Sequence, residues 1–114
     1  MAILVYYLDD EEALCDIFSS FFQSDVIEIV TFSESESAIK ACVERPPSLF
    51  FIDYRLHGAT GDDVAFSVSD EIPKILVTGD HAFTPKYHFQ KVIPKPFDFK
   101  FIQGVLEERL ASES

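Results

Sequence analysis

Short apolar runs alternate along the chain with segments whose apolar residues recur at helical spacing. The apolar runs are Ile3–Leu8, Val26–Phe32, Leu49–Ile52, Ile75–Val77 and Lys91–Ile93. A strand that is apolar on both faces needs cover on both faces, which is typical of parallel sheets sandwiched between helices. The pattern therefore predicts an α/β fold with a five-stranded, doubly wound parallel sheet.

The segments between these runs carry helix signals. Ser33–Glu36 has the Ser-x-x-Glu form of a capping box, which predicts that a helix starts there. Thr84-Pro85 has the form of an N-cap with proline at the first helical position, and it predicts a short fourth helix to about Gln90. Asp98 is expected to cap a final helix that reaches about Leu110.

The chain has 114 residues, and we expect residues 1–114 to form one domain with no output domain attached. Its net charge of -11 argues against broad nucleic-acid binding and against docking on anionic lipid, because phosphate-binding surfaces are positive. The longest apolar run, Ala2–Leu8, is too short to span a bilayer, and it lacks the cationic flank of a signal peptide. Cys15 and Cys42 are expected to be reduced thiols, so a cytoplasmic location is predicted.

Polar and charged residues stand where the predicted strands end. In chain order these residues are Asp9 and Asp10, Asp53, Thr78-Gly79 and Lys95. The carboxyl ends of parallel strands meet at one edge of the sheet, and this is where folds of this class bind ligands. We therefore expect these side chains to form one site.

Three carboxylates at one edge repel one another unless a cation lies among them, and hard oxygen ligands in an open site suit Mg²⁺. A metal beside a carboxylate, a hydroxyl and an ammonium can bind a phosphoryl group, and the carboxylate can attack its phosphorus. Taken alone, each residue has an ordinary alternative, such as a helix cap for Asp9-Asp10, a loop carboxylate for Asp53 or a solvated side chain for Lys95. Their combination favours the site.

With these residues, the sequence resembles the receiver domain of bacterial response regulators, the CheY-like family, over essentially its whole length. The matching pieces are Leu8–Glu11, Pro47–Asp53, Gly58 and Gly61, Pro73–Gly79 and Pro94–Phe97. Each piece alone is weak, but together they stand in order at near-family spacing. The resemblance implies a flavodoxin-like sheet and signalling in a two-component system.

By this resemblance, Asp53 accepts a phosphoryl group from a sensor histidine kinase, a phosphotransfer protein or a small phosphodonor. Asp10 would bind Mg²⁺ directly and Asp9 would bind it through water. Asp53 and the backbone carbonyl of Arg55 would complete the metal ligands. The resemblance also implies a cis Lys95–Pro96 peptide bond.

By the same resemblance, Thr78 and Lys95 would bind the phosphoryl oxygens. Arg55, Gly79 and Asp80 are expected to modulate the site. Arg55 lies two residues after the acceptor and Asp80 two residues after Thr78, so these side chains should overhang the site and form a partly exposed ion pair.

The sequence departs from the family at three places. His57 stands where the family usually has proline, which is expected to change loop stiffness rather than chemistry. Val92 occupies the slot of the Tyr or Phe that many receivers use in their switch, and the segment of the fourth helix is several residues shorter than usual. Phe83, Tyr87 or Phe89 is expected to replace the missing aromatic residue.

The apolar residues of the final helix cover about half of its circumference, more than the roughly 100° stripe that core burial needs. They are Phe99, Phe101, Ile102, Val105, Leu106 and Leu110. We expect part of this surplus to face a partner or to form a homodimer, and phosphorylation to remodel Asp80–Gln90 and an interface that includes Phe99 or Phe101. The alternative is a Phe-rich core that extends to the surface.

The sequence thus predicts a phosphorylation-dependent switch that signals by protein–protein contact to a downstream protein that it does not identify. We expect no enzyme activity beyond promotion of its own phosphorylation and dephosphorylation. One alternative is an atypical pseudo-receiver, a phosphorylation-independent interaction scaffold, which Val92 favours and the complete site disfavours. A flavodoxin-like cofactor binder is disfavoured because Asp9-Asp10 would repel phosphate without a metal.

Overall fold

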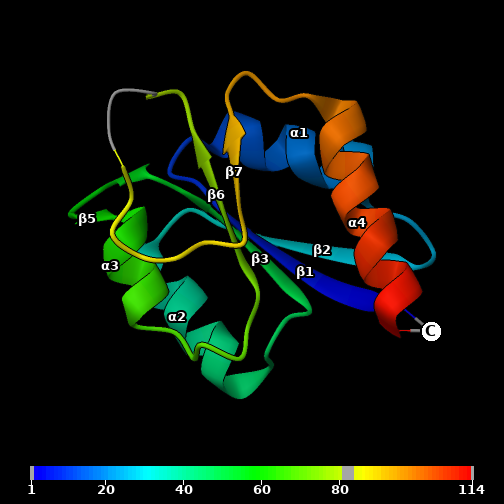
Figure 1. The fold of residues 1–114 in the computed structure, drawn as a ribbon, viewed down its shortest axis with the longest axis horizontal. Coiled ribbons are helices and arrows are strands. Elements are labelled where there is room, and N and C mark those ends of the chain that lie inside the picture. The colour runs from blue at the N-terminus through cyan, green and yellow to red at the C-terminus, as the bar shows by residue number, and fades with distance from the viewer. Residues whose placement is uncertain (1, 81–83, 114) are drawn as a thin grey trace.

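The computed structural model describes residues 2–80 and 84–113, and it contains a five-stranded parallel sheet with helices on both faces (Figure 1). In spatial order the strands are β2 (Ile27–Phe32), β1 (Ile3–Leu8), β3 (Leu49–Asp53), β6 (Lys74–Thr78) and β7 (Lys91–Pro94). The helices are α1 (Glu12–Phe22), α2 (Ser35–Glu44), α3 (Gly61–Phe66) and α4 (Phe99–Glu113). A small antiparallel ribbon of β4 (Arg55–Leu56) and β5 (Ala59–Thr60) follows β3. The predicted fold class is confirmed.

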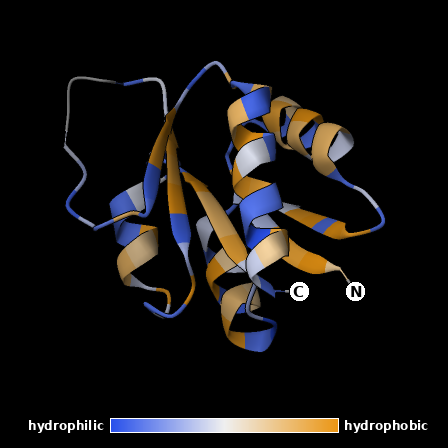
Figure 2. Ribbon diagram, turned by 45° about the vertical axis from the view of Figure 1, so that its right-hand side comes forward, coloured by the Kyte–Doolittle hydropathy of each residue, from blue (hydrophilic) through white to orange (hydrophobic). Residues whose placement is uncertain are grey.

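The sheet has an apolar core on each face because side chains alternate along a strand. Ile3, Val5 and Tyr7 of β1 pack with residues of α1 and α4, whereas the residues between them pack with α2 and α3. Figure 2 shows the outcome: the strands are mostly hydrophobic, while the helices carry both hydrophobic and hydrophilic surfaces. Within residues 2–80 and 84–113, no helix is both long and apolar enough to cross a membrane.

The connection from β6 to β7 contains no helix over the described residues 84–90, so the predicted short fourth helix is wrong there. In that helix the Gln90 N–H would donate to a carbonyl one turn earlier. It donates instead to the Lys74 carbonyl at 3.0 Å, where the pairing of β7 with β6 begins. The N–H groups of Lys86 and Tyr87 donate to the buried carboxylate of Asp62 in α3 at 3.0 to 3.1 Å. A helix of two turns has little stability of its own, and these tertiary bonds outweigh it. We call residues 84–90 the strap.

A buried lysine holds the side of the strap that faces the core. The Lys74 Nζ donates to the carbonyls of Ser69 at 2.7 Å and Ile72 at 3.1 Å, and it lies 3.0 Å from the Tyr87 hydroxyl. That hydroxyl donates to the Asp70 carboxylate at 2.9 Å. Burial lowers the pKa of Lys74, and the three oxygen acceptors compensate for the loss of water around its ammonium. The strap is therefore tied to α3 and to the turn that precedes β6.

Two helix starts differ in how well the sequence predicts them. The predicted capping box at Ser33–Glu36 is wrong, because α2 begins after Glu34 with no side-chain bond to its N-cap. A capping box forms instead at α3, where Thr60 and Asp63 exchange side-chain and backbone hydrogen bonds at 3.0 and 3.3 Å.

The final helix is capped as predicted and is slightly longer. The Asp98 carboxylate accepts hydrogen bonds from the N–H groups of Lys100 at 3.1 Å and Phe101 at 3.2 Å. The helix continues to Glu113 rather than ending at about Leu110. Its buried residues are Ile102, Val105 and Leu106, whereas Phe101 is 47% exposed. Part of the apolar surplus therefore does lie at the surface.

Two glycines should respond oppositely to replacement by alanine. A Cβ at Gly61 would lie 2.9 Å from a Leu76 methyl carbon, 3.0 Å from the Asp53 carbonyl oxygen and 3.1 Å from the Tyr54 Cα, and backbone atoms cannot move aside cheaply. We expect Gly61→Ala to lower the free energy of unfolding by about 1–3 kcal/mol. At Gly104 in α4 a Cβ meets nothing within 4 Å, so Gly104→Ala should raise it by about 0.5–1 kcal/mol. Urea unfolding of both variants measures the two effects, and equal effects would contradict this packing.

Candidate functional site

The carboxyl ends of β1, β3 and β6, with the segment after β7, surround an open hollow of about 990 Å³. Its lining is formed by Asp10, Glu11, Asp53, Arg55, Thr78, Gly79, Asp80 and Lys95. The structure thus brings the predicted site residues together, with one difference. Asp9 is fully buried and is not part of the lining.

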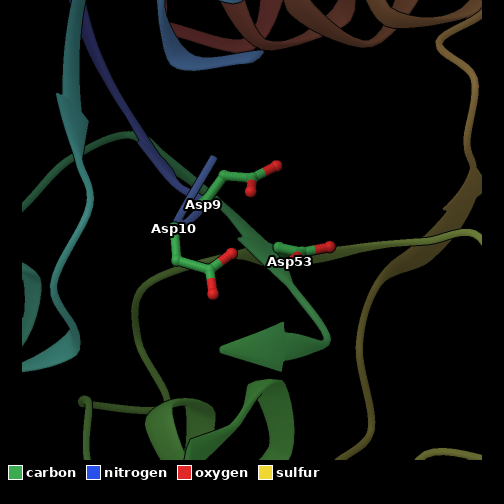
Figure 3. Close-up of side chains that lie close together, drawn as sticks. All are labelled: Asp9, Asp10 and Asp53. Atoms are coloured by element: carbon green, nitrogen blue, oxygen red, sulfur yellow. The ribbon is translucent and has the colours of Figure 1, made fainter. Parts of the chain in front are cut away.

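Three carboxylates lie close together at this edge of the sheet, as Figure 3 shows. Asp9, Asp10 and Asp53 each offer one carboxylate oxygen, and these oxygens lie within 4.8 Å of one another. Like charges at this distance oppose ionisation of the group unless cations compensate them. The cluster therefore suits a divalent metal ion, and within the described residues a lysine already supplies one positive charge.

The Asp9 carboxylate is satisfied by three donors from the protein. Its Oδ2 accepts a hydrogen bond from the Tyr7 hydroxyl at 2.6 Å and one from the Lys95 Nζ at 2.9 Å. Its Oδ1 accepts a bond from the Glu11 N–H at 3.0 Å. Tyr7 was not among the predicted site residues. A tyrosine two residues before Asp9 on the same face of an apolar strand was the available signal.

Lys95 bridges two carboxylates, because its Nζ also lies 2.9 Å from Asp53 Oδ1. The predicted cis bond between Lys95 and Pro96 is present, and the Lys95 N–H donates to the Thr78 carbonyl at 2.9 Å. Burial opposes the charge on this ammonium, but its bonds to Asp9 and Asp53 outweigh burial and raise the pKa of Lys95. The lysine is thus held in its charged form above the end of the sheet.

Asp53 is a carboxylate that titrates close to neutral pH. Burial raises its pKa to about 6; the hydrogen bond from Lys95 opposes this rise, and the charge of Asp9 adds to it. Its side chain is 8% exposed and still lines the hollow, so a small reactant can reach it. The group is mostly ionised above this pKa, as a nucleophilic carboxylate must be.

Thr78 and Gly79 also line the hollow. The Thr78 Oγ1 accepts a hydrogen bond from the Asp80 N–H at 3.0 Å, so its own proton remains available to a ligand or to the Asp80 carbonyl at 3.5 Å. A Cβ at Gly79 would lie 3.7 Å from the Cβ of Lys95. A methyl group at this position would therefore be in ordinary van der Waals contact with the lysine side chain.

Arg55 and Asp80 form the ion pair expected at the rim of the hollow. The Arg55 guanidinium donates to the Asp80 carboxylate, and the two side chains are 74% and 27% exposed. An exposed pair of this kind contributes about 0–1 kcal/mol to stability. Its position over the hollow, rather than its energy, makes it relevant to the site.

His57 lies nearer to the site than its sequence position suggested. The ribbon of β4 and β5 turns at Gly58, whose φ of 73° favours glycine, and the His57 Nδ1 reaches within 3.3 Å of an Asp10 carboxylate oxygen. The His57 ring is almost completely exposed, and Asp10 is partly exposed. The sequence offered no signal for this contact, because the two residues are 47 positions apart.

Val92 stands at the position where an aromatic residue is missing from the sequence, and the aromatic residues predicted to replace it have different surroundings. Val92 is 49% exposed, whereas Phe89 is buried and packs against Tyr87 with ring centroids 5.1 Å apart. Tyr87 also packs edge-on against Phe66 of α3. Phe83 lies outside the described residues. The two described aromatic residues of the strap thus pack on the α3 side.

The raised pKa of Asp53 predicts a pH-dependent stability. Between its ordinary pKa of 3.8 and about 6, the folded protein binds this proton more tightly than the unfolded chain does. The ionised carboxylate therefore costs stability above pH 6, by about 3 kcal/mol, and the cost disappears as the pH falls toward 4. Without divalent metal, Asp53→Asn should be more stable than the wild type at pH 7 and should lose this advantage near pH 4.

Urea unfolding across this pH range measures the difference between the two proteins. Asp25→Asn, at an exposed carboxylate outside the hollow, is the matched control and should show no such trend. A gap between Asp53→Asn and wild type that stays constant with pH would contradict the assignment.

No protein-family model and no curated protein matches this sequence. Solved structures do match it. A CheY-like response regulator receiver domain from Methanospirillum hungatei JF-1 has a TM-score of 0.86 at 17% identity, over 98% of this chain and 96% of that chain. One from Methylobacillus flagellatus has a TM-score of 0.83 at 15% identity, over 96% and 99%.

A third similar structure is the response regulator TrrA from Thermotoga maritima in complex with Mg²⁺-BeF. It has a TM-score of 0.83 at 20% identity, over 96% of this chain and 99% of that chain. The TM-scores establish a shared fold, and at sequence identities this low the likeness shows the fold alone. The strand order found here agrees with that fold. The chain therefore has the CheY-like fold of response regulator receiver domains.

Proposed function

We propose that this protein is a phosphoacceptor receiver domain, a phosphorylation-dependent switch in two-component signal transduction that is phosphorylated on Asp53. The observation that carries the proposal is the Asp53 carboxylate, which lines the hollow 2.9 Å from the Lys95 ammonium and is grouped with Asp10. The receiver fold supports a signalling role of this class.

The proposed reaction is a phosphoryl transfer to Asp53. A carboxylate oxygen attacks the phosphorus of a phosphohistidine or of a small acyl phosphate. The bond from phosphorus to the donor nitrogen or oxygen breaks, and the leaving group keeps its electron pair. The Lys95 ammonium and the Thr78 hydroxyl bind oxygens of the transferred group, and the raised pKa of Asp53, about 6, leaves the nucleophile mostly ionised at neutral pH.

The donor atoms at the hollow fit Mg²⁺, which prefers a few carboxylates and keeps several waters. Asp10 and Asp53 would hold the ion, with the Arg55 backbone carbonyl as a further ligand. When bound, the ion neutralises negative charge on the phosphoryl oxygens. The similar structure of TrrA is a complex with Mg²⁺-BeF, which supports this choice of metal. Asp9 would act only through water, since its carboxylate already has three donors.

The proposed partners are a sensor histidine kinase or a phosphotransfer protein on the input side and a downstream protein on the output side. The half-exposed Phe101 of α4 offers an apolar contact to that protein or to a second copy of this chain. Phe99 is less available because its ring stacks on Phe21 with centroids 4.2 Å apart. The protein would work in the cytoplasm, where Cys15 and Cys42, both free thiols in the structure, stay reduced.

In this proposal the protein catalyses no reaction beyond its own phosphorylation and dephosphorylation. The Arg55–Asp80 pair at the rim, beside Gly79, would set the phosphate lifetime by hindering an attacking water. A phosphorylation-independent scaffold is the less favoured alternative, because it gives no reason for Asp53, Thr78 and Lys95 to line one hollow.

Intact-mass measurement tests the proposed acceptor. Acetyl phosphate with Mg²⁺ should add one phosphoryl mass to the wild type and none to Asp53→Asn, since an amide oxygen is a poor nucleophile. Asp25→Asn should be modified like the wild type. Equal modification of Asp53→Asn, or no modification of the wild type, would contradict the proposal.

Metal binding should be measurable as stabilisation. At a Mg²⁺ concentration of ten times Kd, binding to the folded state alone adds about 1.4 kcal/mol to the free energy of unfolding and raises Tm. Asp10→Ala should abolish this increase and, because it removes one of three close charges, should raise stability in the absence of metal. A full Mg²⁺-dependent increase in Asp10→Ala would show that the ion binds elsewhere.

A further inference from the structure

Tyr7 carries a buried polar group that the proposed phosphoryl transfer does not use. The residue is fully buried in β1 and its ring is fixed on both sides. It stacks on Phe18 of α1 with ring centroids 4.4 Å apart and meets Phe97 edge-on at 5.9 Å. The hydroxyl is thereby aimed at the carboxyl end of the strand, where it donates to Asp9 at 2.6 Å.

The oxygen that Tyr7 contacts is the oxygen that also binds Lys95. Asp9 Oδ2 accepts from the Tyr7 hydroxyl at 2.6 Å and from the Lys95 Nζ at 2.9 Å, and the same Nζ lies 2.9 Å from Asp53. A continuous series of contacts therefore runs from the phenol to the proposed phosphoacceptor. Burial and the neighbouring Asp9 raise the pKa of Tyr7, so the phenol keeps its proton.

Phosphorylation would place conflicting demands on Lys95. Its ammonium must turn from the two carboxylates toward a phosphoryl oxygen. Asp9 has no exposed surface, and a buried carboxylate that loses its cation is costly unless other donors remain. The Tyr7 hydroxyl and the Glu11 N–H are the donors that would stay in place.

We propose that Tyr7 is a positioning residue of this site: its hydroxyl holds the buried Asp9 carboxylate and so allows Lys95 to turn to the phosphoryl group. The inference rests on the proposed phosphorylation of Asp53 and adds to it a residue that lies outside the hollow. Without the hydroxyl, Asp9 depends more strongly on Lys95, and the lysine is withheld from the incoming group.

The test compares Tyr7→Phe with Tyr6→Phe, using beryllofluoride with Mg²⁺ as the probe. Both substitutions remove one hydroxyl from a buried tyrosine of β1, but the Tyr6 hydroxyl donates to the Arg45 carbonyl on the opposite face of the sheet. A hydrogen bond to a charged group is strong enough that its loss should weaken beryllofluoride binding about tenfold in Tyr7→Phe. Tyr6→Phe should bind like the wild type, and the Kd for Mg²⁺ alone should be unchanged in both variants.

Two NMR signals distinguish positioning from mere support of the fold. The ¹⁹F resonance of the fluoride that contacts Lys95 should shift in Tyr7→Phe and not in Tyr6→Phe. In the wild type, the Tyr7 hydroxyl proton should give a slowly exchanging downfield ¹H resonance that persists when beryllofluoride binds. This second signal needs no variant, so it remains informative even if Tyr7→Phe folds poorly.

Unchanged beryllofluoride affinity in Tyr7→Phe, a parallel loss of Mg²⁺ affinity, or disappearance of the hydroxyl proton on beryllofluoride binding would each overturn the inference. Failure of the proposed function is distinguishable, because the wild type and Tyr6→Phe would then also fail to bind beryllofluoride.

Discussion

One ammonium group, the Nζ of Lys95, holds together the edge of the sheet on which the site is built. It lies 2.9 Å from a carboxylate oxygen of Asp9 and 2.9 Å from one of Asp53, and it comes from the segment that follows β7. Without this cation, the carboxylates at the ends of β1 and β3 would repel one another. The hydrogen bond from the Lys95 N–H to the Thr78 carbonyl fixes the backbone from which the ammonium reaches them.

Most of the sheet and the site could be predicted from the sequence because both follow from local patterns. The apolar run Ile3–Leu8 can only be buried on both faces, and this property requires a central strand with helices above and below it. In a parallel sheet the strand ends meet, so residues such as Asp53 and Thr78 are brought together although they are far apart in the chain. The composition of the site was therefore predictable, while the function of its members stays a proposal.

The parts that sequence reasoning missed depend on contacts between distant segments. Thr84-Pro85 has a sound local helix signal, but Asp62 takes the N–H groups that follow it and the strap must rejoin β6 by Gln90. Tyr7 belongs to an apolar strand pattern, and only the structure reveals that its hydroxyl meets Asp9. His57 meets Asp10 because of the turn between β4 and β5. At Thr84-Pro85, tertiary contacts override a local helix preference. At Tyr7 and His57, tertiary contacts add a partner that no local pattern predicts.

The central claim is that Lys95 is shared between two carboxylates at rest and turns to a phosphoryl group on Asp53. A crystal structure with Mg²⁺ and beryllofluoride tests it most directly. The account predicts beryllium on an Asp53 oxygen, Mg²⁺ at Asp10, the Lys95 Nζ on a fluoride, and Asp9 still bonded to the Tyr7 hydroxyl. Beryllofluoride bound elsewhere, or Lys95 unmoved between Asp9 and Asp53, would contradict it.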